Sequence, residues 1–156
     1  MIDKSAIGLS DEAFVMPVER GKIREFARAT FSHNAAYLDD PMPVSPPTFL
    51  MTSAFWAPPS GGVYGRMDLD LSRMLHGQQE FVFHGPPPGA GAELTVQSHV
   101  EDIYEKEGKR GGSMTFIVTV TEFRDASGTL VAESRTTGIE TGRPPTQDRP
   151  TAEDGA

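Results

Sequence analysis

One segment of the chain brings a histidine close to two carboxylates. His33 precedes Asp39 and Asp40 in a stretch rich in loop-forming residues that runs to Ser45. An imidazole held beside a carboxylate can exchange protons near neutral pH. A lone histidine near carboxylates more often caps a loop or forms a surface ion pair. The sequence therefore leaves acid–base chemistry at His33 with Asp39 or Asp40 as one of two alternatives.

The other residues that could do chemistry lack the spacing for it. His76, His84 and His99 show no paired metal-ligand spacing such as H-x-x-x-H, and the chain has no cysteine. The glycine-rich stretch 60–65 lacks the Lys-Ser/Thr ending of a phosphate-binding loop. We therefore predict no metal site and no cofactor.

Composition limits the class of protein. The chain has 156 residues, enough for one domain, and a net charge of −8, which argues against a nucleic-acid partner. The N-terminus has no run of signal-peptide type, and the uninterrupted apolar stretch from Thr48 to Ala57 is too short to span a bilayer. We expect a cytoplasmic protein without a membrane partner.

The elements that must position these residues divide into a helical half and a strand half. The spacing predicts an amphipathic helix over Glu19–Thr30 and a central helix over Pro46–Ala57 that is apolar nearly all round. The second half predicts four long strands joined by short turns. These strands are expected over residues 79–84, 93–107, 113–124 and 129–141.

Strand 113–124 carries the clearest alternation, with Met114, Phe116, Val118 and Val120 expected on its core face. The last residues are rich in proline and poor in apolar groups. We therefore predict one α+β domain over residues 1–141, a bent antiparallel sheet wrapping a long apolar helix, and a disordered tail over 142–156.

Several fragments, in order along the chain, resemble the N-terminal-type domain of MaoC-like dehydratases, which have the hot-dog fold. The resemblance covers about residues 14 to 141 and rests on Gly21-Lys-Ile-Arg-Glu-Phe-Ala-Arg-Ala29, Ser45-Pro-Pro-Thr-Phe49, Leu75-His-Gly-Gln-Gln-Glu-Phe81, His84-Gly-Pro and Gly91-Ala-Glu-Leu. It implies a protein that handles acyl thioesters of CoA or of a carrier protein, as a homodimer or as a heterodimer with a catalytic hot-dog subunit.

Catalytic members of that family carry a G-D-x-N-P-x-H motif whose Asp and His form the acid–base dyad. The matching stretch here is Phe31-Ser-His-Asn-Ala-Ala-Tyr37, which retains Asn34 but has Ser32 and Tyr37 at the dyad positions. Neither a serine nor a tyrosine is a ready general base near neutral pH. The resemblance is therefore to the family's subunits that lack the dyad and shape the acyl tunnel beside a catalytic partner.

The resemblance also suggests which residues contact the acyl chain, with core packing as the competing interpretation for the aromatic residues of the central helix. The suggested residues are Asn34, Tyr37, Thr48, Phe49, Thr52, Phe55 and Trp56. Two other functions stay open: a self-sufficient homodimeric hydratase or thioesterase that uses His33 with Asp39 or Asp40, and a non-enzymatic acyl-thioester binding protein. The absence of Asp, Glu and His from Thr48 to Ala57 argues against hydrolysis by this chain alone.

Overall fold

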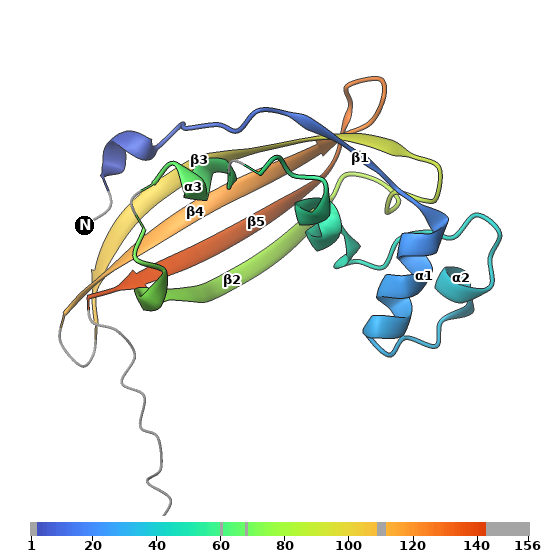
Figure 1. The fold of residues 1–156 in the computed structure, drawn as a ribbon, viewed down its shortest axis with the longest axis horizontal. Coiled ribbons are helices and arrows are strands. Elements are labelled where there is room, and N and C mark those ends of the chain that lie inside the picture. The colour runs from blue at the N-terminus through green and yellow to red at the C-terminus, as the bar shows by residue number, and fades with distance from the viewer. Residues whose placement is uncertain (1–2, 60, 68, 109–111, 143–156) are drawn as a thin grey trace, which may run out of the picture.

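The computed structural model describes residues 3–59, 61–67, 69–108 and 112–142. Its centre is a five-stranded antiparallel sheet in the order β1-β3-β4-β5-β2. The strands are β1 (Phe14–Pro17), β2 (Met74–Phe83), β3 (Glu93–Glu107), β4 (Ser113–Arg124) and β5 (Leu130–Thr141). In Figure 1 the long strands curve together, and α3 (Gly62–Gly65) lies against one face of the sheet. The expected disordered tail lies, apart from residue 142, outside the described residues.

The strand half follows the alternation and turn signals of the sequence closely. β3 and β4 have the predicted bounds, β5 begins one residue later than predicted, and β2 begins at Met74 rather than at residue 79. β3 pairs with β4 and β4 pairs with β5, so that Val96, Phe123 and Ala132 lie in one row across the sheet. The four-residue β1, which the sequence did not predict, pairs with the start of β3.

The covered face of β4 is not the face predicted as its core face, although Val120 of the predicted set is buried. Ile117, Thr119 and Phe123 are buried, whereas Phe116 and Val118 are only half-buried. The first set lies on the covered face of the sheet, which we define as the face that packs against residues 49–59 and 61–67. On the other, open face, Phe116 is shielded by Tyr104, which stacks on it at 4.9 Å between ring centroids.

Two short helices precede the central segment. α1 (Arg20–Ala29) lies within the predicted helix and buries Ile23 and Ala27. α2 (Ala35–Leu38) forms inside the stretch predicted as irregular, where Asn34 caps its first turn. In Figure 1 both helices lie beyond one end of the sheet.

The central helix is the main correction to the predicted architecture. Instead of an α-helix over 46–57, the chain forms a 3₁₀ helix, η2 (Phe49–Phe55), followed by α3 (Gly62–Gly65) and the 3₁₀ turn η3 (Leu71–Arg73). Prolines on both sides leave about ten residues, which is marginal for a cooperative α-helix. The segment is also less enclosed than predicted, since Phe55 is 78% exposed.

Candidate functional site

In the loop that matches the family's dyad motif, the polar side chains of Ser32 and Asn34 bond to backbone groups of the same loop. The Ser32 hydroxyl accepts a hydrogen bond from the Asn34 backbone N–H at 3.3 Å. The Asn34 side chain in turn accepts from the Ala36 N–H at 3.0 Å, which caps α2. Tyr37 is half-buried and packs against the cluster of buried apolar side chains that includes Ile23 and Phe49. The loop thus consists of caps and packing contacts.

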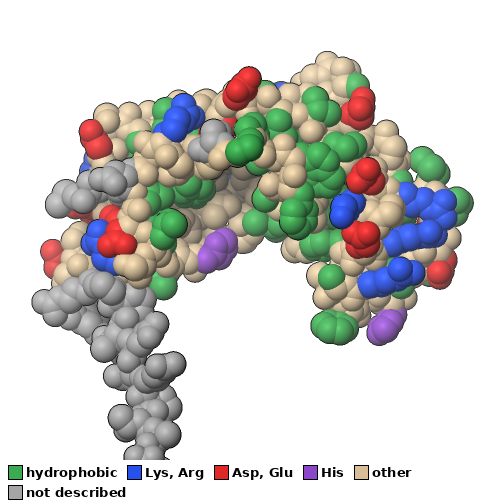
Figure 2. All heavy atoms as spheres, viewed as in Figure 1, with side chains coloured by type: hydrophobic (Ala, Val, Ile, Leu, Met, Phe, Trp, Pro, Cys, Tyr) green, Lys and Arg blue, Asp and Glu red, His purple; other side chains and the backbone are tan. Residues whose placement is uncertain are grey.

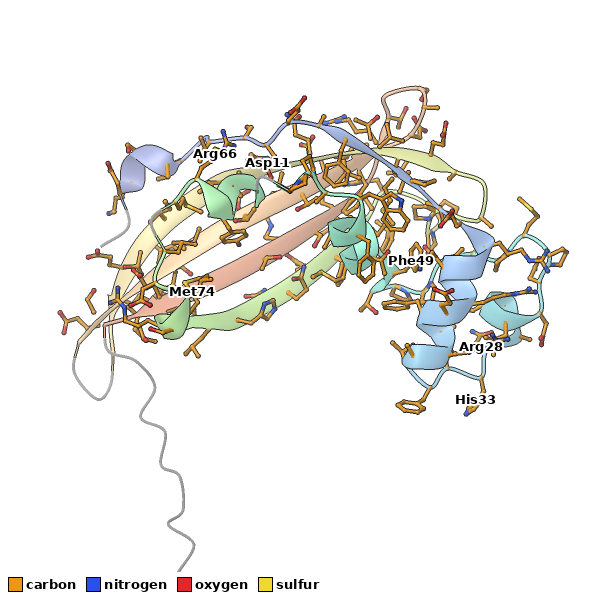
Figure 3. All side chains as sticks on the ribbon, in the orientation of Figure 1. Asp11, Arg28, His33, Phe49, Arg66 and Met74 are labelled. Atoms are coloured by element: carbon orange, nitrogen blue, oxygen red, sulfur yellow. The ribbon has the colours of Figure 1, made fainter. Side chains whose placement is uncertain are left out.

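The alternative acid–base group is not assembled. His33, Asp39 and Asp40 are all exposed, and among the described residues no hydrogen bond or ion pair joins His33 to either carboxylate. One Asp40 oxygen instead accepts from the Met42 N–H at 2.8 Å. Figure 3 shows His33 at the outer end of the α1 and α2 region, far from Asp11 and Arg66.

A cavity of about 520 Å³ lies between the covered face of the sheet and the central segment. Its apolar wall is formed by Phe14, Met51, Val63, Val96 and Phe123. This volume falls within the usual range of small-molecule sites. On the side away from the sheet it is lined by residues of η2 and α3 and of the segment between them.

Hydroxyl groups line the sheet side of the cavity. Ser98 and Thr121 are hydrogen-bonded at 2.9 Å, and the Thr119 hydroxyl donates to the Tyr64 oxygen at 2.9 Å. Thr136 also lines the cavity. Within each bonded pair one O–H donates to the other oxygen, which leaves the second O–H to donate elsewhere. Burial raises the pKa of Tyr64, so its phenol is neutral and remains a donor at physiological pH.

Two carboxylates and one arginine lie at another part of the cavity. Asp11 and Glu12 line it, and Arg66 Nη2 lies 3.3 Å from Asp11 Oδ1 and donates to the Ser10 carbonyl. Burial raises the pKa of Asp11, and the charge of Arg66 partly opposes that shift. Gly62 allows the close approach here, because a Cβ at this position would meet Asp11 Oδ2 at 2.7 Å. No sequence pattern singled out Asp11 or Glu12, because the N-terminal segment meets the end of α3 only in the folded chain.

None of the seven predicted acyl-binding residues is among those that line the cavity. Phe49 is buried, Phe55 is exposed, and Thr52 is buried with its hydroxyl unpartnered. Met51, Ser53 and Ala54 face the cavity instead. A 3₁₀ helix has three residues per turn and an α-helix 3.6, which changes the side chains that meet the sheet. A role for the seven in substrate binding stays a prediction.

The described part of the chain has neither a cluster of metal-ligating side chains nor a membrane-spanning helix. No group of three or more His, Asp or Glu side chains there could hold a metal ion. None of its helices has the length and apolar character needed to cross a membrane.

Known proteins resemble this chain over most of its length. The profile described as FAS1-like, dehydratase domain region, matches residues 5–134. A UPF0336 protein of Saccharopolyspora erythraea is 32% identical over 145 residues, which cover 88% of this chain and 87% of that protein. The UPF0336 protein SCO4636 of Streptomyces coelicolor is 36% identical over 116 residues, which cover 69% of this chain and 77% of that protein.

Solved structures share the fold. The HadBC complex of Mycobacterium tuberculosis, described as a 3R-hydroxyacyl-ACP dehydratase, matches with a TM-score of 0.66 at 24% identity over 86% of this chain and 96% of that chain. A MaoC-like dehydratase matches with a TM-score of 0.72 at 22% identity over 87% of this chain and 42% of that chain. The ChsH1-ChsH2 complex of Mycobacterium tuberculosis matches with a TM-score of 0.70 at 16% identity over 92% of this chain and 89% of that chain.

These likenesses confirm the predicted α+β hot-dog architecture, with the central helix shortened as described. The matched profile covers most of the chain, from the first 3₁₀ turn, η1 (Lys4–Ala6), into β5. The chain therefore belongs to the family of FAS1-like dehydratase domain regions and has the hot-dog fold of MaoC-like dehydratases.

Proposed function

We propose that this chain is a hot-dog subunit of an enoyl hydratase or 3-hydroxyacyl-thioester dehydratase that binds the acyl part of the substrate beside a catalytic hot-dog partner. The observation that carries the proposal is the cavity of about 520 Å³ under the sheet. It offers an apolar wall for an acyl chain without a histidine among its lining residues.

The chemistry of hydration explains why this chain needs a partner. Adding water across an enoyl double bond requires a base for the water and an acid for the carbon, held together in one geometry. The titratable side chains lining the cavity are Asp11, Glu12 and Tyr64. Asp11 is paired with Arg66, and the dyad positions hold Ser32 and Tyr37. Binding without proton transfer is the role that this set supports.

The structural neighbours support assembly with a second hot-dog chain. HadBC and ChsH1-ChsH2 are each described as a complex of two named components. We propose the same kind of assembly here, with an acyl thioester of CoA or of a carrier protein as the substrate. The hydroxyl row of Ser98, Thr119 and Thr121 would then face oxygen or amide groups of that substrate.

The test measures hydration of trans-2-enoyl thioesters by loss of enoyl absorbance. We expect no activity from the chain alone and activity when it is co-expressed with a hot-dog protein that retains the Asp/His dyad. Activity of the chain alone, lost in His33→Ala, would support the self-sufficient alternative and overturn the proposal. Acyl-thioester binding without turnover in any mixture would identify a binding protein.

A cavity variant tests the acyl site itself. Ala54→Phe adds a ring at a residue that lines the cavity, whereas Ala36→Phe adds the same ring on exposed α2. We expect Ala54→Phe to raise the KM for dodecenoyl substrates at least fivefold with little effect on butenoyl substrates, and Ala36→Phe to change neither. An equal effect on both chain lengths would argue against acyl binding in this cavity.

A further inference from the structure

Three arginines form a row along α1. Arg20, Arg24 and Arg28 are spaced by four residues, which places them on one side of the helix over a rise of about 12 Å. Arg20 and Arg28 are exposed, and Arg24 is half-buried. Figure 2 shows Lys and Arg side chains gathered over this end of the molecule, in a chain whose net charge is −8.

The row differs from the other described arginines in having no acidic partner. Outside α1, every arginine that the structure describes is ion-paired with a carboxylate: Arg66, Arg73, Arg124 and Arg135. Within the described residues, none of the three arginines of the row forms an ion pair or a side-chain hydrogen bond, and the buried Nε of Arg24 has no partner. Lys22, elsewhere on the same helix, is paired with Glu25 at 2.9 Å.

Helix stability does not account for the row. Like charges four residues apart repel one another on a helix surface. The helix dipole favours Arg28, which lies in the last turn of α1, but Arg20, the first residue, faces the positive end of that dipole. The unpaired row therefore lowers the stability of the free protein. Such a row fits a surface that binds the acidic groups of another molecule.

The helix that carries the row packs against the element that leads to the cavity. Phe26 of α1 packs edge-to-face against Phe49 at 5.6 Å between ring centroids. Phe49 begins η2, and Met51, two residues later, lines the cavity. A molecule bound on α1 would therefore contact the element that leads directly into the proposed acyl site.

We propose that the arginine row docks the acidic face of an acyl carrier protein that delivers the thioester; this rests on the proposed function and selects the carrier protein over CoA. A row of separate cations along about 12 Å matches carboxylates spaced along a partner helix. A phosphate group of CoA is better held by cations that converge on one point. The docking surface thus fits a protein rather than a nucleotide.

The experiment measures binding to the full chain by calorimetry, with three probes: holo acyl carrier protein, dodecanoyl acyl carrier protein and dodecanoyl-CoA. Arg20→Glu/Arg28→Glu is compared with Lys4→Glu/Lys22→Glu, which changes the net charge equally but leaves the row intact. We expect the first variant to weaken both carrier-protein probes at least tenfold and the second to weaken them less than twofold. Binding of dodecanoyl-CoA should change in neither, and carrier-protein affinity should fall with added salt.

Three results would overturn the docking proposal. They are unchanged carrier-protein binding in Arg20→Glu/Arg28→Glu, an equal loss of dodecanoyl-CoA binding, and loss of association with the hot-dog partner instead. If the glutamates disturb folding, Arg20→Gln/Arg28→Gln replaces that variant. It removes the charge without reversing it and should also weaken carrier-protein binding. Row-dependent binding of holo carrier protein without any acyl binding in the cavity would leave the docking surface standing and refute the proposed function.

Discussion

Hydroxyl groups and the two carboxylates of Asp11 and Glu12, with no imidazole among the lining residues, give the cavity its polar character. Thr119 and Tyr64 come from different elements, β4 and α3, and meet at 2.9 Å. Hydroxyls hold their protons at neutral pH and so can orient a bound oxygen without removing a proton. The side chains of the cavity therefore favour binding over proton transfer at this site.

The Tyr64 phenol offers a direct test of this environment. Because burial raises its pKa, the folded chain keeps this phenol protonated at a pH where the unfolded chain has lost the proton. The unfolding free energy should therefore fall as the pH rises through the usual tyrosine pKa near 10. Ultraviolet titration should show a late-ionising phenol that Tyr64→Phe removes and that Tyr104→Phe, on the open face, leaves in place. A late phase that survives in Tyr64→Phe would show that this phenol is not the buried one.

At the scale of elements, α1 ends in a way that the sequence does not favour. The Phe31 N–H bonds to the Arg28 carbonyl and the Ser32 N–H to the Ala27 carbonyl, which is the Schellman pattern. Phe31 occupies its left-handed position with φ of 55° and is 86% exposed. Glycine is the residue that usually takes this position, because a Cβ there is strained.

Phe31→Gly should therefore stabilise the isolated chain by about 1 kcal/mol, measured by urea unfolding. Phe31→Ala is the control, because it removes the ring but keeps the Cβ and should give little of that gain. A loss of stability in Phe31→Gly would mean that the ring makes contacts worth more than the strain. Reduced association with the hot-dog partner in both variants would assign the exposed ring to that interface.

A comparison of the predicted and observed elements shows how far the sequence determines the fold. The strands were predictable because alternation and turn residues act locally, as the matching bounds of β3 and β4 illustrate. The faces of β4 were not predictable, because the buried Thr119 hydroxyl is satisfied by Tyr64, a residue distant in sequence. The cavity depends on η2 being a 3₁₀ helix, which apolar composition alone does not distinguish from an α-helix.

At the scale of the whole molecule, the open sheet has two unequal edges. β1 has four residues and ends at Pro17, whose ring nitrogen cannot donate to a further strand. β2 has ten residues that are mostly exposed, including Leu75 and Val82. A long, largely uncharged edge strand is a template for pairing with another sheet.

We expect β2 to be the edge that continues into the partner's sheet. Leu75→Lys/Val82→Lys should weaken association with a hot-dog partner at least tenfold, because each charge would be enclosed at the junction. Val15→Lys/Thr95→Lys places the same charges beside the β1 edge and should leave association unchanged. Light scattering after gel filtration measures the assembly, and circular dichroism checks that both variants stay folded. If the β1-edge variant alone dissociates the complex, the pairing edge is β1, and the β2 edge must be covered in another way.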